Sequence, residues 1–226
     1  MREIVLDTET TGLSFKNGDR VIELGCVELI NHITTGNNLQ FYCSVKKKID
    51  EGAAKVHGLT NEFLASHPPF ADQVDEFLSF IKNDVLIIHN ADFDLGFINN
   101  ELKLSGKDPI KNKVIDTVFL ARKKLNTRIA NLDYLCRRFS IDLSERKLHG
   151  ALLDCQLLAE VYLELNGGKQ ISMNLNKTNN TKENLKENNT LTTTNISKVT
   201  PTNDEILLHK QLTKQIKNSL WEKIDY

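Results

Sequence analysis

A thirty-residue stretch near the C-terminus has a composition that excludes it from the folded core of this chain. Residues 174–203 contain nine Asn and eight Thr, with no aromatic residue and no Gly. A segment of this composition cannot bury enough apolar surface to offset the entropy lost on ordering, so we expect a disordered linker. Residues 1–166 carry periodic apolar segments throughout and are expected to form the folded domain.

The composition excludes several classes of protein. Hydrophobic residues make up 40% and charged residues 26% of the 226 positions, which are globular values. No apolar run approaches the roughly 18 residues of a membrane span, and the N-terminal apolar stretch is too short for a secretory signal, so we expect a cytoplasmic protein. The four cysteines are scattered without a CxxC pair, which indicates neither a zinc site nor a disulfide framework. Because the net charge is −1, local patches or a partner must supply any affinity for a polyanion.

The order of apolar patterns predicts an α/β fold in which helices flank a mixed sheet. Strand patterns occur at 4–6, 20–30, 38–45, 85–88 and 114–115, and helical patterns at 60–66, 71–82, 92–104, 117–125, 131–138 and 150–165. Beyond the linker, apolar residues between Ile206 and Ile224 predict a short amphipathic helix. It contains the only Trp, a favoured interface anchor, so we prefer a docking peptide to a tail that folds back on the domain.

Asp7 and Glu9 follow the first buried strand. If the strand continues, their two-residue spacing directs both carboxylates to one face. Repulsion and desolvation disfavour that arrangement unless a cation lies between the two groups. The alternative is a solvated turn across residues 7–12.

A second acidic motif, HNADFD at residues 89–94, lies where a strand ends and a helix begins. Asp92 fits a helix N-cap, the commonest use of an acid at this place. Asp94 would lie beside the apolar stripe of the helix and is the better functional candidate. His89 and Asn90 could either orient a substrate or cap the helix.

A third motif joins His149 to Asp154, five positions later. On one helix these side chains would lie about 140° apart, so both can serve one site only if His149 precedes the helix. Asp154 has Leu157 and Leu158 as helical neighbours and is therefore expected to face the core. A buried acid needs a partner, either a divalent metal or a lysine or arginine in a salt bridge.

Together the motifs predict one oxygen-rich site, made of Asp7, Glu9, Asp94, Asp154 and His149. Hard ligands of this kind suit Mg²⁺ or Mn²⁺ rather than zinc. Such acids commonly hold two metal ions that clamp the attacking and leaving oxygens of a phosphodiester. The histidine would take a proton from the attacking water.

The three motifs, DTETTGL at 7–13, HNADFD at 89–94 and LHGALLD at 148–154, resemble the histidine-bearing branch of the DEDD superfamily of 3′–5′ exonucleases. VHGLTNEF at 56–63 and AEVY at 159–162 resemble, more narrowly, the epsilon or proofreading subunits of bacterial DNA polymerase III. The resemblance implies an RNase H-like fold and an enzyme that removes mispaired 3′-terminal nucleotides from DNA with two divalent ions, Mg²⁺ or Mn²⁺. Metal ligation is implied for Asp7, Glu9 and Asp154, with Asp94 as the fourth acid and His149 as general base.

The resemblance also implies contacts with the substrate. His57 matches a residue that contacts the terminal nucleotide. Position 52, where such proteins often carry an acid, is Gly52 here, so any contact must use its backbone unless Glu51 substitutes. The implied substrate-binding set is therefore Asp7, Glu9, Gly52, His57 and Asp154. Two further acids lie in or near the motifs: Asp92 departs from the small or apolar residue expected, and Asp116 is expected to support the site without binding metal.

Past the domain, Gln170, Met173 and Leu175 lie in a peptide that resembles the short motif by which replication proteins bind the sliding clamp. The resemblance implies an exonuclease domain at 1–168, a clamp-binding peptide at 169–176, the linker at 177–203 and a helix at 204–226. That helix would dock on the polymerase alpha subunit and place the protein at the replisome on the nucleoid, with a small accessory core subunit as a further candidate partner. The docking residues implied are Ile216, Leu220 and Trp221.

Two other functions stay open. A free-standing RNA-trimming or DNA-repair exonuclease of the same superfamily would need no tether, and the tail argues against it. A non-catalytic adaptor would need no acids, and the complete acid set argues against that. Residues 111–147 hold ten basic residues and four acids, and this positive segment either faces the DNA backbone or is simply solvated.

Overall fold

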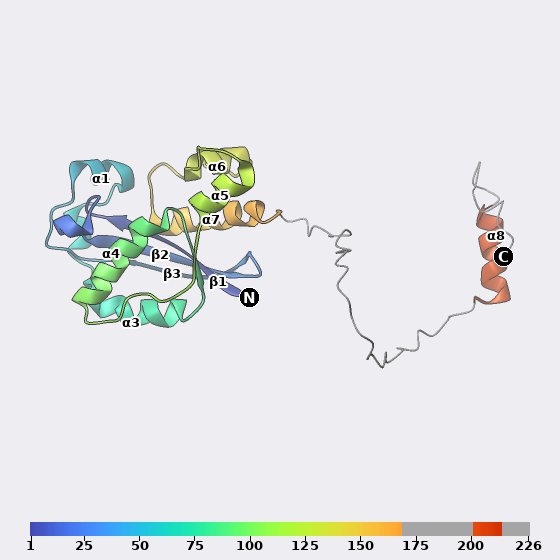
Figure 1. The fold of residues 1–226 in the computed structure, drawn as a ribbon, viewed down its shortest axis with the longest axis horizontal. Coiled ribbons are helices and arrows are strands. Elements are labelled where there is room, and N and C mark those ends of the chain that lie inside the picture. Colours follow the sequence, from blue (N-terminus) through green and yellow to red (C-terminus); the bar gives the residue numbers. More distant parts are fainter. Residues whose placement is uncertain (169–200, 214–226) are drawn as a thin grey trace, which may run out of the picture. The chain divides into compact units, whose positions relative to one another are not determined.

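The computed structural model describes residues 1–168 and 201–213. The chain divides into two compact units, Met1–Leu175 and Asn176–Tyr226, and each is described by itself. In the first unit the predicted mixed sheet with flanking helices is confirmed (Figure 1).

The sheet has five strands in the order β3-β2-β1-β4-β5. The central strand β1 pairs antiparallel with β2 and parallel with β4, and β5 continues the parallel half. Parallel strands end at the same edge of a sheet, so β1, β4 and β5 bring the residues that follow them together. The strands are β1 (Arg2–Thr10), β2 (Val21–Ile30), β3 (Ile33–Tyr42), β4 (Val85–Ile88) and β5 (Val114–Asp116).

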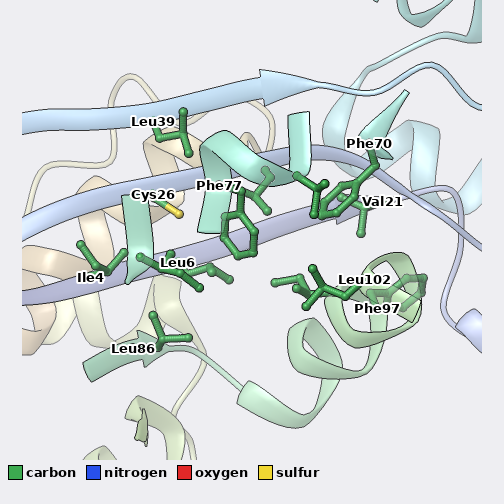
Figure 2. Packing of buried hydrophobic residues seen from close by; sticks show 14 of the residues in the cluster. Ile4, Leu6, Val21, Cys26, Leu39, Phe70, Phe77, Leu86, Phe97 and Leu102 are labelled. Carbon is green, nitrogen blue, oxygen red and sulfur yellow. The ribbon is translucent and has the colours of Figure 1, made fainter. Parts of the chain in front are cut away.

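Alternation along β1 divides the interior into two cores. Ile4 and Leu6 point to one face, where α3 (Phe70–Ile81) and α4 (Ala91–Leu104) cover them. Figure 2 shows Phe77 of α3 and Leu86 of β4 among the side chains of this core. Val5 points to the opposite face, beneath α5 (Thr117–Leu125), α6 (Leu132–Arg138) and α7 (Ala151–Leu165). The four cysteines are free and buried, as expected of a chain without a disulfide framework.

Two local predictions were wrong or incomplete. The segment Glu51–His57 forms a helix, α1, that the sequence pattern did not predict. The predicted short helix α2 (Asn61–Leu64) follows it. Asp92 is not a helix N-cap: the cap of α4 is Asn90, which has a left-handed backbone with φ +67°. A short 3-10 helix, η1 (Phe15–Asn17), follows β1.

The second unit contains one described helix, α8 (Asn203–Thr213), which matches the start of the predicted C-terminal helix. Its Leu207, Leu208 and Leu212 are exposed. The proposed clamp peptide with Gln170, Met173 and Leu175, most of the linker, and Ile216, Leu220 and Trp221 lie outside the described residues. Within the described part, no helix is both long and apolar enough to cross a membrane.

Candidate active site

Asp7 and Glu9 lie within β1, which continues to Thr10. The solvated-turn alternative is therefore wrong for these two acids. Because side chains alternate along a strand, both carboxylates share the face of Val5, on the α7 side of the sheet. Glu9 is buried and Asp7 is half-buried.

Asp154 comes from α7, and His149 precedes that helix as predicted, since α7 begins at Ala151. The carboxylate of Asp154 is buried, whereas the side chain of His149 is 46% exposed and its backbone N–H donates to the carbonyl of Val56. Ligand atoms of Glu9, His149 and Asp154 all lie within 4.8 Å of one another. The first and third motifs therefore meet in space.

Two residues of β2 hold the start of α7 in this position. Glu23 is buried, and its carboxylate accepts hydrogen bonds from the backbone N–H groups of Ala151 and Leu152. Gly25 makes the close approach possible, because a Cβ there would lie 2.5 Å from the carbonyl carbon of Ala151. Sequence reasoning missed Glu23; an acid inside an otherwise apolar strand is the signal that marks it.

Asp94 is buried in the first turn of α4, and Thr8 donates a 2.6 Å hydrogen bond to its Oδ1. The N-terminus of α4 is in turn held by Asp116, whose carboxylate accepts from the backbone N–H groups of Asn90 and Ala91. Asp116 also caps α5, in keeping with its expected supporting position. Asp92 is exposed.

Burial and mutual repulsion raise the pKa values of three acids. Burial, with the charges of Asp154 and Glu23, raises the pKa of Glu9 to about 8, and burial raises the pKa of Asp94 to about 7 despite the hydrogen bond from Thr8. Burial and the charges of Asp94 and Glu9 hold the pKa of Asp7 well above its usual range. A site that resists three negative charges favours an added cation, and carboxylate oxygens with one imidazole fit a divalent metal ion.

Asp154 differs because it already has a cationic partner. The Nε and Nη2 atoms of Arg146 lie 2.6 and 2.7 Å from its two oxygens. Burial alone would raise the pKa of Asp154, but the hydrogen bonds from Arg146 and His149 outweigh burial and hold that pKa below its usual range. The salt-bridge alternative is therefore present in the structure, beside an acid cluster that still fits a metal.

Two cavities flank the acids, and both are lined by Asp7, His89, His149 and Asp154. The smaller, of about 240 Å³, extends toward Leu13, Val56 and His57; Gly52 does not line it and is exposed in the first turn of α1. His57 is buried, its Nδ1 accepts from the N–H of Leu59, and its Nε2 makes no hydrogen bond of standard geometry among the described residues.

The larger cavity, of about 380 Å³, extends toward Asp133, Arg137 and Arg146. His89 lies between the two and its Nδ1 is 2.8 Å from the hydroxyl of Thr117.

Residues 4–162 match the RNase_T family, described as exonucleases. The chain is 43% identical over 224 residues to DNA polymerase III subunit epsilon of Rickettsia felis, with 96% of this chain and 97% of the relative covered. This chain belongs to the exonuclease family of DNA polymerase III epsilon subunits. Other epsilon relatives include that of Buchnera aphidicola, 42% identical over 97% of this chain and 98% of the relative, and that of Escherichia coli, 46% identical over 74% of this chain and 72% of the relative.

Solved structures agree on the fold. Exonuclease X in complex with 5′ overhanging duplex DNA aligns with a TM-score of 0.58 at 21% identity, over 72% of this chain and 90% of that one. Escherichia coli exonuclease I, in a zinc-bound complex with single-stranded DNA, aligns with a TM-score of 0.65 at 17% identity, over 74% and 41%. The predicted RNase H-like exonuclease fold and the prediction of an epsilon-type 3′–5′ exonuclease are confirmed.

Proposed function

We propose that this exonuclease of the epsilon family removes mispaired 3′-terminal nucleotides from DNA, with two divalent ions, Mg²⁺ or Mn²⁺, held by Asp7, Glu9 and Asp154 and with Asp94 as the fourth acid. The observation that carries the proposal is the convergence of Glu9, His149 and Asp154 ligand atoms within 4.8 Å at the edge where parallel strands end. When bound, such ions stabilise the attacking and leaving oxygens of a phosphodiester.

His149 is the proposed general base. Its Nδ1 lies 3.2 Å from Oδ2 of Asp154, and Nη2 of Arg146 lies 3.0 Å from Nδ1 and 3.3 Å from Nε2, so Asp154 and Arg146 together hold the ring beside the acids. The exposure of the ring gives a water molecule access to it. The proton that leaves the attacking water would be taken up at a ring nitrogen of His149.

The smaller cavity is the proposed binding site of the terminal nucleotide. Its wall combines the apolar Leu13 and Val56 with the buried His57. An unpaired 3′ end costs less free energy to unstack than a paired one, so a mispaired end enters more readily. The implied contact at Gly52 would have to involve backbone, because glycine has no side chain, unless Glu51 substitutes; Gly52 itself does not line this cavity.

The remaining chain is the proposed tether. Residues 1–168 would be the nuclease, 169–176 a clamp-binding peptide led by Gln170, 177–203 the linker and 204–226 the helix that docks on the alpha subunit through Trp221. Support comes from the match of 96% of the chain to an epsilon subunit of similar length, and from the exposed leucines of α8. A tether raises the local concentration of nuclease at the primer end. The proposed location is the cytoplasm, at the replisome on the nucleoid, where a small accessory core subunit is a further candidate partner.

Degradation of matched primers tests the function. With Mg²⁺, we expect a 3′-mispaired DNA primer to be shortened faster than a paired one, and faster than an RNA strand of the same sequence. The matched control is the double variant Asp7→Ala/Glu9→Ala, which should be inactive. Preference for RNA would instead support the free-standing trimming enzyme, and equal activity of the double variant would refute the assigned metal ligands.

A further inference from the structure

Arg146 is the most enclosed cation of the candidate site, although none of the three motifs includes it. Its side chain is 8% exposed, and it comes from the segment between α6 and α7. Two parallel hydrogen bonds join it to both oxygens of Asp154, and its Nη1 forms an ion pair with Asp133 of α6. Its Nη2 also lies 3.0 Å from Nδ1 of His149.

This arrangement places a positive charge where the acid cluster needs one. Asp154 belongs to the group whose ligand atoms converge with those of Glu9 and His149. A two-pronged contact between a guanidinium and a carboxylate occupies both oxygens in a fixed geometry, and it is among the stronger hydrogen-bonded pairs in proteins. A divalent cation that approaches the same carboxylate meets the field of the guanidinium at short range.

We infer that Arg146 is a resident counter-cation of the metal site: it neutralises Asp154 while the site lacks metal and competes with the incoming divalent cation for that carboxylate. The inference rests on the metal site of the proposed function and assigns a role to a residue outside the motifs. Arg146 acts on the site through Asp154.

The ion pair with Asp133 would hold the guanidinium in place after a metal ion has displaced it from Asp154. Asp133 is 45% exposed and holds Nη1, so Arg146 stays anchored to α6 when Asp154 turns to a metal ion. Both residues line the larger cavity together with Arg137. The free N–H donors of the guanidinium then face a cavity of about 380 Å³ with a second arginine in its wall.

Titration of the full chain with Mn²⁺ tests the inference, with the electron paramagnetic resonance signal of free Mn²⁺ as the readout. In Arg146→Met, which keeps the length and apolar stem of the side chain, we expect the Mn²⁺ dissociation constant to fall by about tenfold because one competing charge is gone. The melting temperature measured in EDTA should fall in the same variant and recover when Mn²⁺ is added. Arg146→Lys keeps the charge without the two-pronged contact, so its dissociation constant should lie between those of the wild type and the Met variant.

A purely structural role of Arg146 would change the Mn²⁺ dissociation constant in the opposite direction. If Arg146 only positions Asp154, its loss weakens Mn²⁺ binding, and an unchanged or higher dissociation constant in Arg146→Met would overturn the inference. Should that variant fail to fold, Arg146→Lys decides alone: a lower dissociation constant than wild type supports the exchange, and an equal or higher one refutes it. A wild-type chain that binds no Mn²⁺ would instead refute the metal site of the proposed function.

Discussion

The hydroxyl of Thr8 donates a 2.6 Å hydrogen bond to Oδ1 of Asp94, and both residues are buried. This contact joins β1 to the first turn of α4, so that the fourth acid of the site is oriented by the strand that carries the first two. Thr8 points to the opposite face from Asp7 and Glu9 and belongs to the same motif. Its role is to fix the carboxylate of Asp94.

Loss of that hydroxyl should impair catalysis without loss of the fold. In Thr8→Val, which has a similar volume, we expect kcat to fall by about 10- to 100-fold, as is common when a partner of a metal-site carboxylate is removed. Thr8→Ser keeps the hydroxyl and is the matched control. Equal rates of primer degradation for Thr8→Val and wild type would show that Asp94 does not depend on this bond.

Gly25 should tolerate no side chain. An added Cβ would meet the backbone of Ala151 at 2.5 Å, and backbone cannot give way as a flexible side chain can, so α7 must move from β2 together with Asp154. We expect Gly25→Ala to lower the free energy of unfolding by about 1–3 kcal/mol. Urea denaturation of the full chain measures the loss.

The matched control is Gly52→Ala, also a glycine-to-alanine change near the site. No atom lies within 4 Å of a Cβ at Gly52, which is exposed in α1. Here alanine should stabilise the protein by about 0.5–1 kcal/mol because it favours the helix. Similar destabilisation by both substitutions would contradict the close-packing explanation.

His149 should be required for the chemical step and not for folding. We expect His149→Gln to lower kcat by about 10²–10⁴-fold, the usual contribution of a general base. The melting temperature should change little, because the side chain is 46% exposed. A large loss of melting temperature accompanied by a small loss of kcat would assign His149 a structural role instead.

The stability of the metal-free protein should fall as the pH rises from about 7 to 8. Burial raises the pKa of Glu9 to about 8, so in this interval the native state retains a proton that the unfolded chain has released, and each increase in pH favours unfolding. Burial lowers the pKa values of His57 and His89, so near pH 7 only the unfolded chain still releases protons from them, and they oppose the trend weakly. Urea unfolding in EDTA at the two ends of the interval measures the change. Glu9→Gln should reduce it and leave the part contributed by Asp7 and Asp94, whose pKa values are also raised; a rise in stability would contradict the assigned shifts.

Removal of residues 174–226 should separate hydrolysis from assembly. Both cavities and all assigned acids lie in residues 1–168, so the truncated chain should degrade single-stranded DNA at the wild-type rate. Co-purification with the polymerase alpha subunit should be lost. Loss of hydrolysis on truncation would contradict the modular arrangement.

The central strand and its acids were predictable because their signals are local. An apolar run followed by Asp7 and Glu9 at a spacing of two defines which face the carboxylates share. The position of His149 before α7 followed from helical geometry alone. By contrast, α1 spans only two turns and contains Gly52 and adjacent alanines, so it offers no apolar stripe to detect.

The contacts that hold the site together could not be predicted because they join segments far apart in the chain. Asp116 of β5, and not Asp92, satisfies the N-terminus of α4, which is why the local N-cap rule failed. Glu23 performs a similar task for α7 from β2. A salt bridge to Asp154 was one of two alternatives, but no local pattern identified Arg146 as its partner.

The two sides of the site differ in how firmly the backbone holds them. β1 pairs with β4 up to Leu6 and with β2 along the whole acidic motif, so Asp7 and Glu9 belong to a ladder that exchanges its amide hydrogens only when the sheet opens. His149 and Arg146 come from a connection outside any ladder, in which their N–H groups bond to the carbonyls of Val56 and Leu143, so smaller openings suffice. Amide exchange should therefore be slower at the acids of the strand than at His149, so the proposed proton acceptor can change position while the proposed metal ligands of the strand stay fixed.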